Sequence, residues 1–177
     1  MIVAEPSLFD AACSVTWRGI SREEANDALI SWEHKIGTMR RVDYGQEACH
    51  GLIHDGKILA ITCTSGLVRE TVGGCPWATR ATAIELSRLC ASRKDLNRAA
   101  LRLWRVFTFP QFDRQWAISY QDDDLHTGAT YRNDGWHRVA FSASGVDQRT
   151  DRRGRNKWVW VWPEPPADHI SPHDAAP

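Results

Sequence analysis

Hydrophobic residues recur at helical spacing in two stretches of the chain. In the first they stand at positions 25, 28, 29 and 32, after Ser21 and Glu24, whose spacing is that of a capping box. This pattern predicts a helix over Arg22–His34, ended by Gly37. In the second stretch the apolar residues follow the i, i+3, i+4, i+7, i+11 pattern: Leu96, Ala99, Ala100, Leu103 and Phe107. We expect a second helix there, closed by Pro110.

Short apolar runs predict strands in much of the remaining chain. Ala48–Ile53 and Lys57–Thr64 are joined through Asp55 and Gly56, a strong hairpin signal, so these two strands should be antiparallel. Three later strands are expected at Trp116–Gln121, Trp136–Ser142 and Lys157–Trp162, the last with tryptophans on one face and valines on the other. A short helix is expected over His126–Arg132, before the turn at Asn133–Gly135.

One further strand, Ala83–Cys90, has an irregular pattern. Its apolar residues lie on even positions at Ile84 and Leu86 but on an odd position at Leu89. A β-bulge near Ser87 and Arg88 would explain this change of phase, because one extra residue turns the following side chains to the other face.

The order of these elements predicts a mixed α/β fold with a mostly antiparallel, twisted sheet and flanking helices. We expect one domain over residues 1–163, with Met1–Thr16 as a loose lead-in or first strand and Ser65–Arg80 as a loop. The Pro-, Asp- and Ala-rich tail over 164–177 is expected to be disordered.

Composition limits the classes of partner and compartment. The formal net charge is zero, so any polyanion must be bound by a local patch. The five cysteines show no paired metal-ligand spacing, and His50 and His54 are too far apart along a strand to favour a metal site. No apolar run has the length of a membrane span, and no signal peptide is recognisable. We therefore expect a cytoplasmic protein with no metal; the sequence does not indicate an oligomeric state.

The strand-helix-strand crossover at the centre of the chain is the first candidate site. Its turn places Arg93, Lys94, Asn97 and Arg98 around a helix N-terminus, where free amides and the helix dipole favour an anion. A phosphate-bearing cofactor would fit there. The alternative is that these are ordinary solvated side chains. The turn has no P-loop or dinucleotide-binding glycine fingerprint.

The crossover, the following strand and the stretch with Ala129, Tyr131, Gly135 and Trp136 together resemble the core of the GNAT acyltransferase superfamily. The resemblance implies that acetyl-CoA or a related acyl-CoA lies where the bulged strand splays from the next one. The implied cofactor-binding residues are Leu86, Ser87, Leu89, Arg93, Lys94, Asn97 and Arg98.

Four short strings are most similar to the Mom family of Mu-like phages, which modify adenine in DNA. They are ELSRLC (Glu85–Cys90), SYQD (Ser119–Asp122), HTGATY (His126–Tyr131) and GW (Gly135–Trp136). This resemblance implies that Ser119, Asp122 and Tyr131 line the reaction site, with Arg88 and His126 nearby. It also implies host cytoplasm if the protein is phage-encoded.

The chemistry of these side chains fits transfer to an amino group. Asp122 could orient or deprotonate an amine, and the Tyr131 hydroxyl could protonate a departing thiolate. The alternatives are an Asp that caps the next helix and a Tyr that packs under the sheet. Trp32 and His34, at the end of the first predicted helix, would border the acceptor side in this fold.

A basic segment is the second candidate site. Residues 149–157 contain five cations and one acidic residue: Arg149, Arg152, Arg153, Arg155 and Lys157, against Asp151. Such a loop could bind duplex DNA through its phosphates, or be an ordinary solvated loop. Three functions remain open: DNA base modification, acetyl-CoA-dependent N-acetylation of a small amine or protein amino group, and a DNA-binding module without cofactor.

Overall fold

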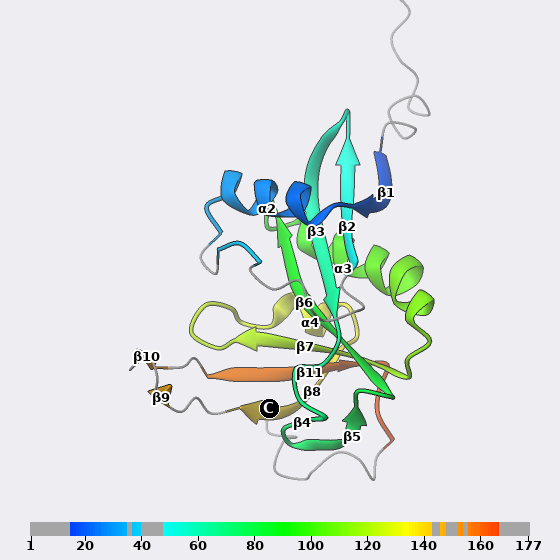
Figure 1. Cartoon of the computed structure of the whole chain (residues 1–177), viewed down its shortest axis with the longest axis vertical. Coiled ribbons are helices and arrows are strands. Elements are labelled where there is room, and N and C mark those ends of the chain that lie inside the picture. The colour runs from blue at the N-terminus through cyan, green and yellow to red at the C-terminus, as the bar shows by residue number, and fades with distance from the viewer. Residues whose placement is uncertain are drawn as a thin grey trace, which may run out of the picture.

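Seven strands form one strongly twisted sheet in the computed structural model, which describes residues 15–34, 37–39, 48–142, 146–147, 152–153 and 156–166. In sheet order the strands are β1 (Val15–Ile20), β2 (Ala48–His54), β3 (Lys57–Ser65), β6 (Ala83–Ala91), β7 (Trp116–Asp122), β11 (Lys157–Trp162) and β8 (His137–Ser142). In Figure 1, β2 and β3 run nearly vertically, whereas β7 and β11 run across the view. Only the β6–β7 pair is parallel among the pairings of this sheet, which confirms the predicted mixed, mostly antiparallel architecture.

Helices cover both faces of the sheet. They are α2 (Arg22–Ser31), α3 (Leu96–Leu103) and α4 (Ala129–Asn133), and α3 continues into the π-helical η1 (Trp104–Thr108) and the 3-10 helix η2 (Phe109–Phe112). None of the helices in the described part of the chain is long and apolar enough to cross a membrane. Two small hairpins complete the structure: β4 (Thr71–Val72) with β5 (Cys75–Thr79), and β9 (Val146–Asp147) with β10 (Arg152–Arg153).

The face that each helix covers follows from the alternation of the strands. On one face, α2 packs its Ala25 and Leu29 against Ile61 and the buried thiols of β2, β3 and β6. On the other face, α3 packs Ala100 against Leu52 and other residues of β2 and β3. We call these the α2 face and the α3 face. Burial of these apolar side chains, at about 25 cal/mol per Å², is the main force that holds the layers together.

The β2–β3 hairpin confirms the strongest local prediction. Asp55 and Gly56 have φ values of 49° and 74°, as a two-residue turn with both central residues at positive φ requires. The tryptophans and valines of β11 also separate as predicted, since Val159 and Val161 pack in a different core cluster from Trp160.

The beginning of the described chain refines the prediction. The first described strand runs over Val15–Ile20, so it overlaps the predicted segment Met1–Thr16 only at Val15 and Thr16; residues 1–14 lie outside the described part. The capping box of Ser21 and Glu24 is present, but the helix ends at Ser31 rather than near His34. Glu33, at φ 50°, turns the chain before Gly37 can do so.

The predicted inward position of Phe107 is wrong, since its side chain is 56% exposed. The cause is the π-helical turn, which inserts one residue and rotates the following side chains around the axis. Trp104 and Thr108 are buried instead. Pro110 therefore does not close one regular helix, because it lies within η2.

Three other boundaries differ from the predictions. The predicted loop Ser65–Arg80 contains the β4–β5 hairpin, which covers the α2 face beneath β7, β11 and β8. The short helix begins at Ala129 rather than His126, because Gly128 precedes it at φ 73°. The chain is described to residue 166, and the tail beyond it lies outside the described residues.

Candidate active site at the split between two parallel strands

The β6–β7 ladder stops after three residue pairs, and this break creates the candidate site. Glu85 and Ile118 form the last of these pairs. One residue later, the pairing of β6 with β3 shifts register, because Thr64 pairs with Leu86 while Cys63 pairs with Arg88. Ser87 is the extra residue, and its Oγ donates to the Cys63 carbonyl at 3.0 Å. The predicted bulge is therefore confirmed, and the pairing of β6 with β7 ends directly before it.

On the α3 face, a side-chain hydrogen bond bridges the split where the ladder ends. The Ser119 hydroxyl donates to the Leu86 carbonyl at 2.9 Å and lies 2.8 Å from the Tyr131 hydroxyl. Because the single hydroxyl hydrogen of Ser119 is used on Leu86, Tyr131 is the donor in the second bond. The structure thus brings together Ser119 and Tyr131, as the sequence predicted.

The ring of Tyr131 is clamped between two tryptophans. It stacks on Trp160 with ring centroids 5.5 Å apart and meets Trp136 edge-on at 5.5 Å. Burial raises the pKa of Tyr131 to about 12, and the hydrogen bond to Ser119 partly opposes this increase. The phenol is therefore protonated at neutral pH, and its proton is held in the hydrogen bond to Ser119.

A tightly packed turn sets the position of α4, which carries Tyr131. Gln121 Oε1 accepts from the Trp160 indole N–H at 2.8 Å, and its Nε2 donates to the His126 carbonyl at 2.5 Å. A Cβ on Gly128 would lie 2.5 Å from both Gln121 Oε1 and Trp160 Cζ2. With its φ of 73° and this close approach, only glycine fits at that position.

On the α2 face, the carboxyl group of Glu85 lies at the same break. Burial raises the pKa of Glu85 to about 7, although Lys157 and Arg88 favour the charged form. Lys157 also places its Nζ 5.8 Å from the ring centroid of Tyr120. Sequence reasoning missed Glu85 as a site residue; the available signal was one carboxylate within the otherwise apolar first half of the strand.

Three predicted residues lie in one neighbourhood on this side of the split. The pKa of His34 is lowered first by burial and then by the proximity of Arg88 and His126, and Arg88 also acts on Glu85. Among the described residues, His34 Nδ1 and Arg88 Nε are buried and have no hydrogen-bond partner. Arg88 uses Nη1 on the Ser87 carbonyl, at 2.8 Å. Trp32, by contrast, is the C-cap of α2 and packs on the apolar cluster of that face.

Asp122 does not join the Ser119–Tyr131 pair. Side chains alternate along β7, so Asp122 lies on the α2 face with Tyr120, while Ser119 lies on the α3 face. Asp122 is buried, and its Oδ1 accepts from the Asp124 amide at 3.1 Å. It thus helps to close the turn after β7, and it pairs in register with Lys157 of β11.

The side chains of the predicted anion site at the start of α3 differ in how accessible they are to a ligand. Arg93 forms a bidentate ion pair with Asp95, whose shortest N–O distance is 2.5 Å, so part of its charge is neutralised. Lys94 and Arg98 are exposed. The Asn97 Oδ1 atom is buried, and the described residues offer it no hydrogen-bond partner.

Most of the predicted DNA-binding segment lies outside the described residues. This applies to Arg149, Arg155 and the side chains of Arg152 and Arg153, whose backbone forms β10. Lys157 is described, and its charge lies at the split rather than on a separate loop. Within the described part, no cluster of three His, Cys, Asp or Glu side chains is placed to hold a metal ion.

Comparison with known proteins identifies the fold. No protein-family model matches the sequence, and a search of curated proteins finds no match. Solved structures do match. The ribosomal-protein-S18-alanine N-acetyltransferase from Escherichia coli is 12% identical, with a TM-score of 0.57 over 83% of this chain and 92% of that one. Arabidopsis thaliana Naa50, in complex with the bisubstrate analogue CoA-Ac-MVNAL, is 8% identical, with a TM-score of 0.56 over 85% and 99%.

A third match is a probable acetyltransferase of the GNAT family from Chromobacterium violaceum. It is 15% identical, with a TM-score of 0.57 over 84% of this chain and 86% of that one. These similarities confirm the predicted fold class, and the narrower resemblance to Mom proteins stays a prediction. The chain has the GNAT acetyltransferase fold.

Proposed function

We propose that the protein transfers an acyl group from an acyl-CoA to an amino group. The observation that carries this proposal is the position of two proton-transfer groups at one break in the sheet: the β6–β7 ladder ends at Glu85, and Tyr131 meets Ser119 at the same place. Burial raises the pKa of Glu85 to about 7 and that of Tyr131 to about 12. General acid–base catalysis works best when the pKa of the base is close to the working pH.

Each side chain then has a defined task. The carboxylate of Glu85 accepts a proton from the attacking amine, and Tyr131 donates its phenolic proton to the departing sulfur. Ser119 holds the phenol in place through the 2.8 Å contact. Acyl-CoA supplies the thioester, whose C–S bond breaks as the new C–N bond forms. The proton count balances, because one proton leaves nitrogen and one reaches sulfur.

The residues that would hold the cofactor fit it in part. The Leu86 carbonyl and the bulge at Ser87 lie where β6 and β7 separate, and this gap gives an extended chain access to backbone groups of β6. Lys94 and Arg98 can meet the pyrophosphate near the start of α3. Arg93 would do so only after its ion pair with Asp95 rearranges. Naa50 supports this choice of cofactor, since its structure is a complex with the bisubstrate analogue CoA-Ac-MVNAL.

For the acceptor, we propose the exocyclic amino group of adenine in duplex DNA. The Mom-like strings SYQD and HTGATY supply Ser119 and Tyr131, which contact each other. The α2 face of the split also carries the positive charges of Arg88 and Lys157, which favour an acceptor with phosphate groups nearby. The basic segment 149–157 would add further phosphate contacts.

Mass spectrometry provides the test. Purified protein is incubated with acetyl-CoA and duplex DNA, free thiol is measured as it is released, and the DNA is digested to nucleosides. We expect release of CoA and a deoxyadenosine of increased mass, both strongly reduced with Glu85→Gln. Glu23→Gln, a change of an exposed glutamate on α2, is the matched control and should behave like the wild type.

The second candidate is N-acetylation of a small amine or a protein amino group. The observation that favours it is the fold, which the chain shares with N-acetyltransferases such as the Escherichia coli enzyme. The same assay separates the two: CoA release with an amine panel, but no modified nucleoside from DNA, would contradict the adenine proposal and leave acyl transfer in place. No CoA release with any acceptor, and no acyl-CoA binding, would contradict acyl transfer itself.

A further inference from the structure

A pocket of about 410 Å³ lies on the α3 face, between the β1–β2 edge of the sheet and the helical segment η1–η2. It shares no lining residue with the split that forms the candidate active site. Its lining is Trp17, Arg18, Gly19, His50, Phe107 and Gln111. The π-helical turn that displaces Phe107 from the core also brings this ring to the pocket, so an irregular helix and a surface pocket have one cause.

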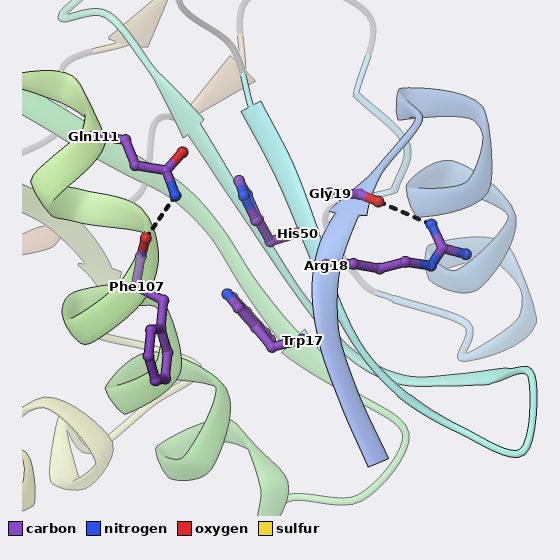
Figure 2. Close-up of a pocket in the computed structure, with 6 residues that line it drawn as sticks. All are labelled: Trp17, Arg18, Gly19, His50, Phe107 and Gln111. Atoms are coloured by element: carbon purple, nitrogen blue, oxygen red, sulfur yellow. Dashed lines mark hydrogen bonds between the residues drawn. The ribbon is translucent and has the colours of Figure 1, made fainter. Parts of the chain in front are cut away.

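Aromatic rings form the two long walls. The rings of Trp17 and His50 stack on each other, with centroids 5.8 Å apart and an interplanar angle of 17°, and both line the same side of the pocket. Figure 2 shows Phe107 across the gap from Trp17. The indole N–H of Trp17 donates to Thr108 Oγ1 at 3.1 Å, so this wall is fixed before any ligand arrives. Two aromatic walls with an open gap favour a flat ring as ligand.

Polar atoms stand at the edge of the gap. Gln111 uses one amide hydrogen on the Phe107 carbonyl, at 2.6 Å, which leaves its other amide hydrogen and its carbonyl oxygen for a ligand. His50 Nδ1 is buried, and no described residue offers it a hydrogen bond. A primary amide pairs in a bidentate manner with a heterocycle edge that carries one donor and one acceptor, as adenine does.

Charge is directed away from the pocket. Arg18 belongs to the lining, but Figure 2 shows its guanidinium pointing away from the gap. It donates to the Gly19 carbonyl at 2.8 Å and forms an ion pair with Glu24 at 3.2 Å. No cation therefore faces the gap among the lining residues, so the pocket suits a neutral ring and not a phosphate or a carboxylate.

We propose that this pocket binds the neutral heterocycle of a nucleobase, stacked between Trp17 and Phe107 and hydrogen-bonded by Gln111. The ring comes either from a free nucleoside or from an unpaired base of a nucleic acid strand, and both present the same flat face and edge. This binding function is separate from acyl transfer, because neither the walls nor the amide belongs to the split.

The test follows the indole N–H signal of Trp17 in a ¹⁵N NMR spectrum, assigned with a Trp17→Phe variant. Adenosine is titrated first, then a single-stranded oligonucleotide of adenine and thymine. We expect a saturable shift of the Trp17 signal. Phe107→Ala should weaken binding about 10- to 100-fold, because stacking on one aromatic ring contributes about 1–3 kcal/mol per base. Gln111→Leu should weaken adenosine binding several-fold.

Val106→Ala is the matched control, since Val106 is an exposed neighbour of Phe107 on the same helix and does not line the pocket.

If the oligonucleotide binds more tightly than adenosine, the bound base comes from a nucleic acid strand. If the two bind with equal affinity, the ligand is a free nucleoside. The proposal is overturned if the Trp17 signal does not move at millimolar adenosine and oligonucleotide. Indole lacks the matching polar edge and serves as a second probe. The proposal is also overturned if indole binds as tightly as adenosine and if Gln111→Leu changes neither the affinity for indole nor the affinity for adenosine. Adenosine bound in the proposed CoA site would be insensitive to Phe107→Ala.

Discussion

The two faces of the sheet differ in chemistry at the one place where β6 and β7 separate. On the α3 face, Tyr131 and Ser119 are neutral, hydrogen-bonded and enclosed by tryptophans. On the α2 face, Glu85 lies among the positive charges of Arg88 and Lys157. Ser119 directly follows Ile118, the strand partner of Glu85, so alternation along the strands directs the side chains of Ser119 and Glu85 to opposite faces.

This difference shows how a break in a ladder can combine an acid and a base that would otherwise neutralise each other. A tyrosine and a carboxylate on the same face could share a hydrogen bond, and the shared proton would be less available to a substrate. With the sheet between them, each group keeps its own environment, and only a substrate that enters the split contacts both. Four predictions test this view, ordered from the largest expected effect to the smallest.

Glu85→Gln should have the largest effect, a loss of about 10²- to 10⁴-fold in kcat/KM, the range expected for removal of a general base. The pH dependence identifies the role. The carboxylate must be charged to accept a proton, so the wild-type rate should rise with pH through about 7, while the residual rate of the variant should lack this step. A variant with the same step at reduced rate would assign the base to another group.

Tyr131→Phe should lower kcat by about 10- to 10³-fold and leave acyl-CoA affinity unchanged, because only the proton on the departing sulfur is lost. A thioester of a more acidic thiol needs less help from an acid. The defect of the variant should therefore shrink when such a donor replaces acetyl-CoA. An equal defect with both donors would mean that Tyr131 acts through packing alone, against Trp136 and Trp160.

Stability should depend on pH through the same carboxyl group. The pKa of Glu85 is raised from 4.5 to about 7 in the folded protein, so the folded state holds this proton more tightly than the unfolded chain. Its contribution to the free energy of unfolding is present in full below about pH 4.5 and is lost as the pH rises through about 7.

Glu85→Gln removes that loss. The variant should be more stable than the wild type above pH 7, by on the order of 1–3 kcal/mol, and should show no such advantage at pH 4. Urea unfolding at the two pH values measures the difference. Equal stabilities of the variant and the wild type at both pH values would show that the carboxyl group is better solvated than its position on the α2 face suggests.

Ser119→Ala should have the smallest effect. It leaves the Leu86 carbonyl without its partner, at a cost of about 1 kcal/mol in stability, and frees the Tyr131 hydroxyl, with a several-fold loss of rate. Ser142→Ala, an exposed position on β8, provides the control. A loss as large as that of Tyr131→Phe would make Ser119 a proton carrier rather than a positioning residue.

Local patterns predicted the parts of the site that depend on neighbours in sequence. The change of phase at Ser87 is visible in the sequence because Leu86 stands at an even position and Leu89 at an odd one. A β-bulge is the simplest irregularity that lets one strand bury both side chains on the same face. The capping box at Ser21 and the turn at Asp55 and Gly56 are local in the same sense. Ser119 and Tyr131 were found through resemblance to known strings, and their contact at 2.8 Å agrees with that choice.

Other features could not be predicted because they depend on packing between distant segments. The pKa of Glu85 reflects burial under the α2 face, which no pattern around residue 85 reveals. Phe107 fits the helical period in the sequence, but the π-helical turn moves it outward. The sequence indicates that Asp122 could act on an amine. The structure shows that its carboxylate lies on the α2 face of the sheet, whereas Tyr131 lies on the α3 face.

The sequence by itself therefore determined the kind and order of elements, the hairpin, the bulge and most of the reactive side chains, since these depend on chain geometry over a few residues. Tertiary structure alone decided which of those side chains meet. The parallel contact of β6 and β7 ends after three pairs because the bulge redirects β6 while β7 continues its pairing with β11. That single divergence opens the gap in which Glu85 and Tyr131, which lie on opposite faces of the sheet, can both act.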